Sequence, residues 1–161
     1  MPYALSRVDQ ENLLTLAAKA TNTEGWKPDA VAFSVSAPGE DQPILGIGVF
    51  EDFTVSRDAT FSFSMMQPAR GGITRGVIEA FIKLAFHERA LRLDRVWITT
   101  TDDNIPALVA LVKLGATFEH RKRAAFRRKD AGIETVKDAI VFLMVNPKFT
   151  APAARAQDNG D

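Results

Sequence analysis

Residues 95–119 read RVWITTTDDNIPALVALVKLGATFE, and this stretch decides the fold. Its first seven residues, Arg95–Thr101, are rich in β-branched side chains and predict a buried strand. The run Asp102-Asp103-Asn104 supplies residue types that cap helix N-termini, and Gly115 is typical of a helix end. A new strand is predicted from Thr117. The helix between them is further indicated by Pro106 in its first turn and by a predicted buried face of Leu108, Leu111 and Val112.

The residues before this stretch predict a strand followed by a long helix. In the strand Ala59–Met66, Phe61 and Phe63 face one way and Ser62 and Ser64 the other. Apolar residues then recur at three- and four-residue intervals, which predicts an amphipathic helix from Thr74 to about Ala90. A parallel strand-helix-strand unit follows from this order.

The remaining segments extend this unit into a larger sheet. The predicted fold class is α/β (α+β), with a mixed, mainly antiparallel central sheet flanked by helices. We expect a single domain over residues 1–147 and a polar tail over residues 148–161. The other expected elements are a weak strand Tyr3–Val8, a helix Asp9–Ala20, strands Ala30–Ser36 and Pro43–Phe53, and a final pair, Thr117–Arg128 and Glu134–Val145.

The composition excludes several classes of protein. The 161 residues are 46% hydrophobic and 25% charged, with 20 basic and 20 acidic residues, so the formal net charge is zero. A neutral chain is not built as a whole to attract DNA or anionic lipid. The lack of cysteine excludes disulfides, thiolate metal sites and an acyl-cysteine intermediate. No segment reads as a secretory signal or a membrane span, and we expect a cytoplasmic location (host cytoplasm or virion if phage-encoded).

A glycine-containing turn, QPARGGITRG at residues 67–76, joins the strand to the long helix. Crowded backbone N–H groups and the helix N-terminus form a site for phosphate, and two arginines add charge. The alternative is a tight connection with two solvated arginines. Candidate cofactor-binding residues here are Met65, Met66, Arg70, Gly71, Gly72, Ile73, Thr74, Arg75 and Gly76, with core packing as the alternative for the two methionines.

The deciding stretch resembles the second half of a GNAT-superfamily acetyltransferase. The matching features are Asn104 at the helix start, Lys113-Leu114-Gly115 at its end, and Phe118-Glu119 on the next strand. The resemblance covers roughly residues 30–145. It is closest to the branch that acetylates ribosomal-protein N-termini and to small acetyltransferase-type proteins of bacteriophages.

This resemblance implies acetyl-CoA as co-substrate and an amine acceptor (a protein N-terminus, a lysine or a small molecule). It also implies that the pantetheine arm lies between the strands Ala59–Met66 and Arg95–Thr101, held in part by Asn104. A plain helix N-cap is the alternative role of Asn104. The chain departs from the family pattern at three positions: Arg70 replaces a glycine of the pyrophosphate motif, Leu111 replaces the acidic tyrosine, and Ala107 replaces a serine used by the ribosomal branch.

Acetyl transfer needs a base for the amine and a proton donor for the sulfur. The main candidates are Glu119 and Ser64. Glu51, Asp52, Asp58 and a water held by Ser62 are further options, each weighed against an ordinary solvated group.

Three functions therefore stay open. The first is an N-acetyltransferase, and the second is a catalytically degenerate GNAT-like protein with a binding or structural (virion) role. The third is a nucleic-acid accessory that uses the basic residues between 121 and 129, although a solvated hairpin is favoured there and nucleic acid is not the expected partner. A homodimer is left open, no membrane partner is expected, and His87 and His120 alone do not indicate a metal site.

Overall fold

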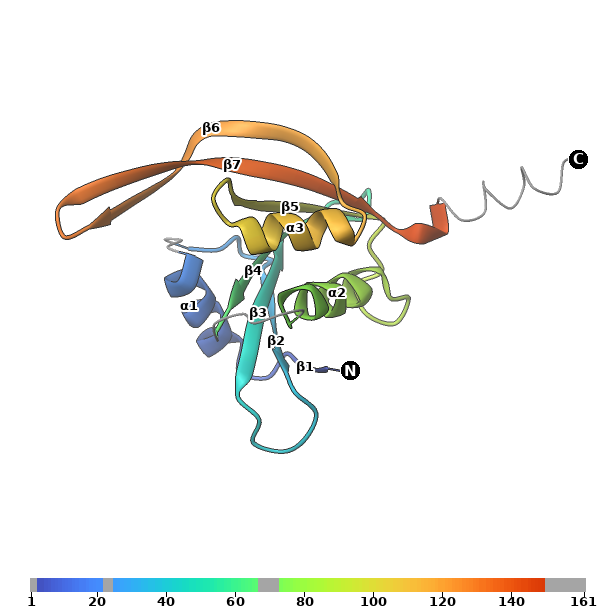
Figure 1. The fold of residues 1–161 in the computed structure, drawn as a ribbon. Coiled ribbons are helices and arrows are strands. Elements are labelled where there is room, and N and C mark those ends of the chain that lie inside the picture. Colours follow the sequence, from blue (N-terminus) through green and yellow to red (C-terminus); the bar gives the residue numbers. More distant parts are fainter. Residues whose placement is uncertain (1–2, 22–24, 67–72, 150–161) are drawn as a thin grey trace, which may run out of the picture.

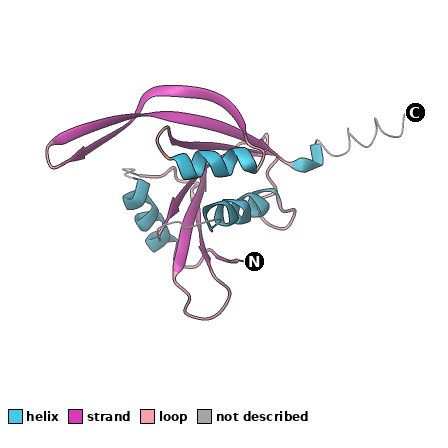
Figure 2. Cartoon of the chain, in the orientation of Figure 1, coloured by secondary structure: helices cyan, strands magenta, loops and turns pink. Residues whose placement is uncertain are grey.

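The computed structural model describes residues 3–21, 25–66 and 73–149. They form one seven-stranded sheet in the order β1-β2-β3-β4-β5-β7-β6, with helices on both faces (Figures 1 and 2). In chain order the elements are β1 Ala4–Ser6, α1 Gln10–Thr21, β2 Val31–Ser36, β3 Ile44–Glu51, β4 Asp58–Met65, α2 Ile73–Phe86, β5 Arg95–Thr101, α3 Ile105–Lys113, β6 Thr117–Asp130, β7 Ile133–Val145 and a 3-10 turn Pro147–Phe149.

Alternating side chains divide the sheet between two cores. Ile47 and Val49 of β3 pack with Leu13 and Ala17 of α1. On the opposite face, Phe50 packs with the buried side chains of α2 in the larger core. Ala110 and Leu111 of α3 also belong to this core. The predicted alternation of phenylalanine and serine in β4 is confirmed, because Phe61 and Phe63 join this larger core.

The predicted mixed, mainly antiparallel sheet is confirmed. Among the described strands, β4 and β5 form the one parallel pair, and α2 is the crossover between them. Because a crossover helix runs antiparallel to its strands, the N-terminus of α2 lies toward the C-terminal ends of β4 and β5.

Glycines let α2 lie close to β3. A Cβ atom on Gly48 would lie 2.7 Å from a ring carbon of Phe61 and 2.8 Å from a ring carbon of Phe81. A Cβ atom on Gly46 would lie 3.0 Å from Val77 of α2. Both glycines thus have close neighbours, and the β2–β3 register also shifts between Gly46 and Ile44.

One helix end and one buried face differ from the sequence predictions. The long helix ends at Phe86 and not near Ala90, because the chain turns back there: Leu93 N donates to Ala85 O (2.8 Å), and Leu93 becomes buried. In α3, Val112 is 63% exposed and does not join the buried face. Small residues, Ala107 and Ala110, take that place beside Leu111.

The β6–β7 hairpin is longer than predicted and projects beyond the sheet (Figure 1). β5 pairs with β7 only from Ala139 to Val145, whereas β6 and β7 stay paired to Asp130 and Ile133. We call residues 119–138 the arm. Of the predicted tail, residues 150–161 lie outside the described residues. No helix in the described part of the chain is long and apolar enough to cross a membrane.

The contact at Gly48 yields a stability prediction. Gly48→Ala should lower the free energy of unfolding by about 1–3 kcal/mol, because the added methyl overlaps two aromatic rings in a packed core. Gly25→Ala is the matched control, since nothing lies within 4 Å of a Cβ atom there. Urea unfolding of both variants measures the difference. Equal stability of the two would contradict the close packing of α2 on β3.

Candidate active site where β4 and β5 separate

The parallel pair β4–β5 is hydrogen-bonded along only part of its length. The ladder joins Asp58 to Arg95 and continues to Phe61 and Ile98, where it stops. Each strand nevertheless continues, and each keeps its outer partner: β4 pairs with β3 as far as Met65, and β5 pairs with β7 as far as Thr101. The edges of residues 62–65 and 99–101 that face the separation therefore have no ladder with each other.

The closed end of the pair is fixed by an ion pair that the sequence did not reveal. Arg95 Nη2 donates to Asp58 Oδ2 (2.6 Å), and Thr54 Oγ1 donates to Asp58 Oδ1 (2.6 Å). Asp58 is 8% exposed. The Thr54 hydroxyl, and then the Arg95 guanidinium, hold the pKa of Asp58 below its ordinary value despite burial. Backbone bonds from Asp94 N and Arg95 N to Arg57 O add to this end.

Two buried hydroxyls near the open end have no hydrogen-bond partner: Ser64 Oγ of β4 and Thr74 Oγ1 in the first turn of α2. Buried polar atoms are nearly always paired, so two orphan hydroxyls at the same end of the strand pair are typical of a site that a ligand completes. The predicted residues Arg70, Gly71 and Gly72 lie outside the described residues.

The other predicted cofactor residues do not all lie at the separation of β4 and β5. Ile73 is 37% exposed at the helix start. Gly76 lies under the ring and hydroxyl of Tyr3, and Arg75 and Gly76 line a cavity of about 790 Å³ between β1 and the outer side of α2. That cavity is not the separation of β4 and β5. Met65 packs against the larger core and Met66 against the α1 core.

Asn104 follows β5 and begins α3. Its Oδ1 accepts a hydrogen bond from Ala107 N (3.4 Å), so the N-cap role is confirmed. The side chain is exposed, and its amide nitrogen makes no hydrogen bond among the described contacts of this residue. Because β5 runs parallel to β4, Asn104 lies at the same open end.

A row of hydroxyl side chains lines the α1 face beside the separation. Ser62 and Ser64 pair with Val49 and Ile47, which belong to the α1 core. On β5, Ile98 lies in the opposite core, so its neighbours face α1. We call this row the hydroxyl strip: Thr60, Ser62, Ser64, Thr99 and Thr101, all half-buried.

Comparison with solved structures shows what this arrangement is similar to. A mutant form of the spermidine/spermine N-acetyltransferase SpeG from Vibrio cholerae is 14% identical, with a TM-score of 0.72 over 94% of this chain and 99% of that one. SpeG from Vibrio cholerae in complex with manganese ions is 14% identical, with a TM-score of 0.71 over 93% of this chain and 96% of that one. A protein described as a probable acetyltransferase is 16% identical, with a TM-score of 0.64 over 91% of this chain and 94% of that one. The chain has the GNAT fold.

In sequence, no family model and no curated protein matches the chain. The likeness therefore lies in the fold.

Within this GNAT fold, the usual positions of the catalytic acid are filled by core residues. Leu111 is fully buried and Ala107 is 1% exposed. Neither side chain can donate a proton.

The predicted bases are not gathered at the separation. Glu119 lies at a register shift of β6, exposed, and β7 lies between β6 and β5, which places Glu119 roughly 10 Å from β5 by strand spacing. Glu51 accepts a hydrogen bond from Lys27 N, Asp52 is exposed, and Asp58 belongs to the closed end. Of the two main candidates, Ser64 is the one that lies at the open end.

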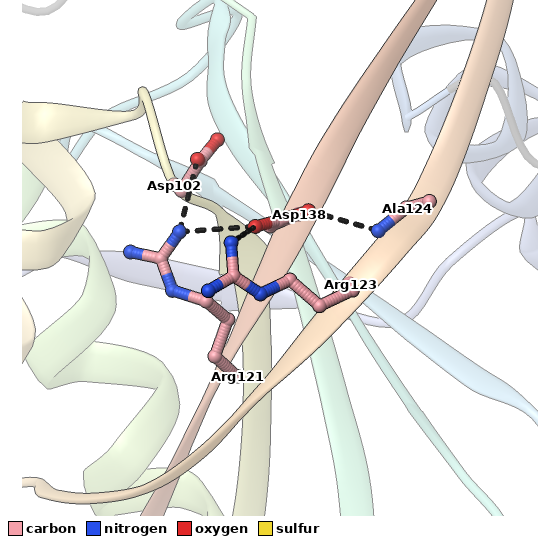
Figure 3. Close-up of polar contacts among 5 residues, drawn as sticks. All are labelled: Asp102, Arg121, Arg123, Ala124 and Asp138. Atoms are coloured by element: carbon pink, nitrogen blue, oxygen red, sulfur yellow. Dashed lines mark hydrogen bonds and ion pairs between the residues drawn. The ribbon is translucent and has the colours of Figure 1, made fainter.

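The arm is tied to the β5–α3 turn by a carboxylate network (Figure 3). Asp138 accepts hydrogen bonds from Ala124 N (2.8 Å), Arg121 Nη1 (3.0 Å) and Arg123 Nη1 (3.3 Å), and Arg121 also pairs with Asp102 (3.4 Å). The Ala124 N–H, then Arg121, hold the pKa of Asp138 below its ordinary value. Much of the basic run is thus engaged in ion pairs within the chain.

A second pair joins the arm to the same turn. Lys137 Nζ lies 2.6 Å from Asp103 Oδ2, and Lys137 lowers the pKa of Asp103. No group of three or more histidine, aspartate or glutamate side chains in the described part of the chain could hold a metal ion.

The closed end yields a pH-dependent prediction. Asp58→Asn should lower the free energy of unfolding at pH 7 by about 1–3 kcal/mol, because it leaves Arg95 without its partner. A lowered folded-state pKa contributes stability that is present above the ordinary value of 3.8 and is lost as pH falls through the folded pKa. The difference between wild type and variant should therefore shrink below about pH 4.

Urea unfolding at pH 7 and pH 3 measures this difference. Glu79→Gln removes an exposed ion pair with Lys83 (3.2 Å) and is the control, with an expected change under about 0.5 kcal/mol. A difference at Asp58 that does not depend on pH would contradict the assignment.

Proposed function

We propose that the protein is an N-acetyltransferase that transfers an acetyl group from acetyl-CoA to an amine. The observation that carries this proposal is the separation of β4 and β5 after Phe61 and Ile98, with both strands held in place by their outer partners. A slender chain with amide groups can pair with such free strand edges in the manner of an added strand. The fold neighbours, a spermidine/spermine N-acetyltransferase and a probable acetyltransferase, support the same reaction class.

The residues at the open end fit this cofactor. The unpaired backbone edges of residues 62–65 and 99–101 can hydrogen-bond the amides of the pantetheine chain of the cofactor. The N-terminal N–H groups of α2 suit the pyrophosphate, with Thr74 adding a hydroxyl and Arg70, Gly71 and Gly72 as the expected sequence partners. Asn104 can donate from its amide nitrogen while its oxygen caps α3.

The chain supplies this reaction mainly with position. When acetyl-CoA is bound, its thioester carbonyl is the electrophile, the amine nitrogen forms the new bond, and the thiolate leaves. Fixing two reactants in an attack geometry can provide a large part of a rate enhancement without any acid or base residue. Ser64 can accept a hydrogen bond from the amine or from a water that removes its proton. Glu119 is assigned no proton transfer, because β7 separates it from the site.

A second function has a specific observation in its favour. Leu111 and Ala107 occupy the usual acid positions and are buried in the core. A non-catalytic GNAT-like protein with a binding or structural role would retain the fold and lose those groups. Calorimetry with acetyl-CoA followed by a thiol-release assay with amines separates the two: tight binding without thiol release, for every amine tested, supports the non-catalytic protein.

The orphan hydroxyls yield a prediction that separates binding from folding. Ser64→Ala and Thr74→Val should leave the free energy of unfolding unchanged or slightly raised, because each removes a buried group that has no partner. The same variants should weaken acetyl-CoA binding about five- to tenfold, which corresponds to one lost hydrogen bond. Urea unfolding and calorimetry measure the two effects. Unchanged affinity in both variants would count against this site.

Asn104 yields a second binding prediction with a matched control. Asn104→Asp keeps the oxygen that caps α3 but removes the amide donor, whereas Asn104→Leu removes both. If the donor holds the cofactor, both variants should bind acetyl-CoA about tenfold more weakly, and only Asn104→Leu should also lose about 1 kcal/mol of stability. Wild-type affinity in Asn104→Asp would limit this residue to its capping role.

A further inference from the structure

The proposed function leaves the acceptor open, and the surroundings of the site restrict it. An acceptor must reach the separation of β4 and β5 from one face of the sheet. On the α2–α3 face, Phe61, Ile98 and Leu111 are completely buried in a packed core. On the other face, α1 lies against β2, β3 and β4. The hydroxyl strip on that face is half-buried, so it is the side from which an amine can approach.

The hydroxyl strip contains no carboxylate. The acidic residues of the described chain beside it lie at its ends: Glu51 is opposite Thr60 and accepts a hydrogen bond from Lys27 N, and Asp102 and Asp103 pair with residues of the arm. Polycations are held by carboxylates, because an ammonium group that leaves water without a partner is strongly disfavoured. Within the described residues, the strip itself offers a polyamine no carboxylate.

The arm is positively charged, whereas a polyamine, itself a cation, needs negative charge around its site. Residues 119–138 contain seven basic and four acidic residues, a net charge of +3, in a chain whose total is zero. Residues 123–138 of the arm project beyond the C-terminal end of β5, at the end where β4 and β5 are separated, whereas residues 119–122 lie beside the part of β7 that pairs with β5 (Figure 1). Arg123 and Arg127 are 83% and 65% exposed, so their ion pairs leave both guanidinium groups largely in solvent. Such a field repels cations and attracts anions that approach the open end.

The absence of a base in the hydroxyl strip points to the kind of amine. A lysine or polyamine nitrogen has a pKa near 10.4 and must lose its proton at neutral pH. An α-amino group has a pKa of about 7.7–8.0, so a sizeable fraction is already neutral at pH 7.5. Hydroxyls and water can orient such a nitrogen, but they cannot readily deprotonate a strongly basic one.

We propose that the acceptor is the α-amino group of an acidic peptide, and not a polyamine. This inference rests on the proposed function and makes it specific. The free α-amine lies over the hydroxyl strip, and acidic side chains that follow it face the basic arm.

The experiment measures thiol release from acetyl-CoA at pH 7.5 with three acceptors at matched concentration. These are a peptide with a free N-terminus followed by aspartates and glutamates, a peptide of the same length with arginines in place of the acids, and spermidine. We expect kcat/KM for the acidic peptide to exceed that for spermidine at least tenfold. We also expect the advantage over the arginine peptide to fall as salt is added.

Charge reversal on the arm tests the recognition itself. Lys122 and Lys129 are exposed and belong to neither the core nor the hydroxyl strip. Lys122→Glu with Lys129→Glu should lower kcat/KM for the acidic peptide about three- to tenfold and raise it for the arginine peptide, whereas the double Lys→Arg variant should match wild type.

The outcomes distinguish the two levels of the proposal. A preference for spermidine, or equal use of acidic and arginine peptides in wild type and variants, overturns this inference and leaves acetyl transfer standing. Absence of thiol release with every acceptor overturns the proposed function, and the inference falls with it.

Discussion

One end of the β4–β5 pair is locked and the other is open, and the rest of the site depends on this asymmetry. At the locked end, Asp58 and Arg95 form an ion pair in which the Asp58 side chain is largely buried and that of Arg95 is 42% exposed, and four residue pairs form the parallel ladder. Beyond Phe61 and Ile98, the strands are held only by β3 and β7. Because each outer partner continues to the end of its strand, the free edges are each held by a ladder on their other side. A preorganised pair of edges can bind an extended chain without paying to order itself first.

The helices place polar groups around this opening. Gly46 and Gly48 allow α2 to pack close to β3, and the crossover brings the first turn of α2, with Thr74, to the open end. Asn104 ends the β5 turn and starts α3 at the same end. Three separate segments, β4 with the Ser64 hydroxyl, the first turn of α2 with Thr74, and Asn104 before α3, thus bring polar groups to the same end of the strand pair. Their convergence, rather than any one of them, supports a ligand site.

The sequence predicted what depends on local pattern. Period-two alternation predicted the two faces of β4, and the stretch from Arg95 to Glu119 predicted the strand, cap and helix around Asn104. Long-range partners could not be predicted in this way: Asp58 and Arg95 are 37 residues apart, and nothing local in either segment indicates that they pair. The Asp138 network depends on an irregular register between Lys122 and Phe126, which shifts which side chains meet. Val112 was misassigned because α3 is apolar on its exposed side as well, so periodicity alone did not mark the buried face.

In the proposed acetyl transfer, Leu111 at the position of the family's acid leaves the departing sulfur without a proton donor from α3. A thiol of ordinary pKa, about 8.5, leaves as a thiolate at modest cost near neutral pH, so a proton donor for the sulfur contributes less than it would for a poorer leaving group. The amine side is more demanding, because a protonated amine has no lone pair with which to attack. A site that contains hydroxyls but no placed base therefore shifts the proton requirement onto the acceptor. In the acetyl transfer proposed above, acceptor choice follows from the pKa of the amine and from the charge that the arm places around the open end.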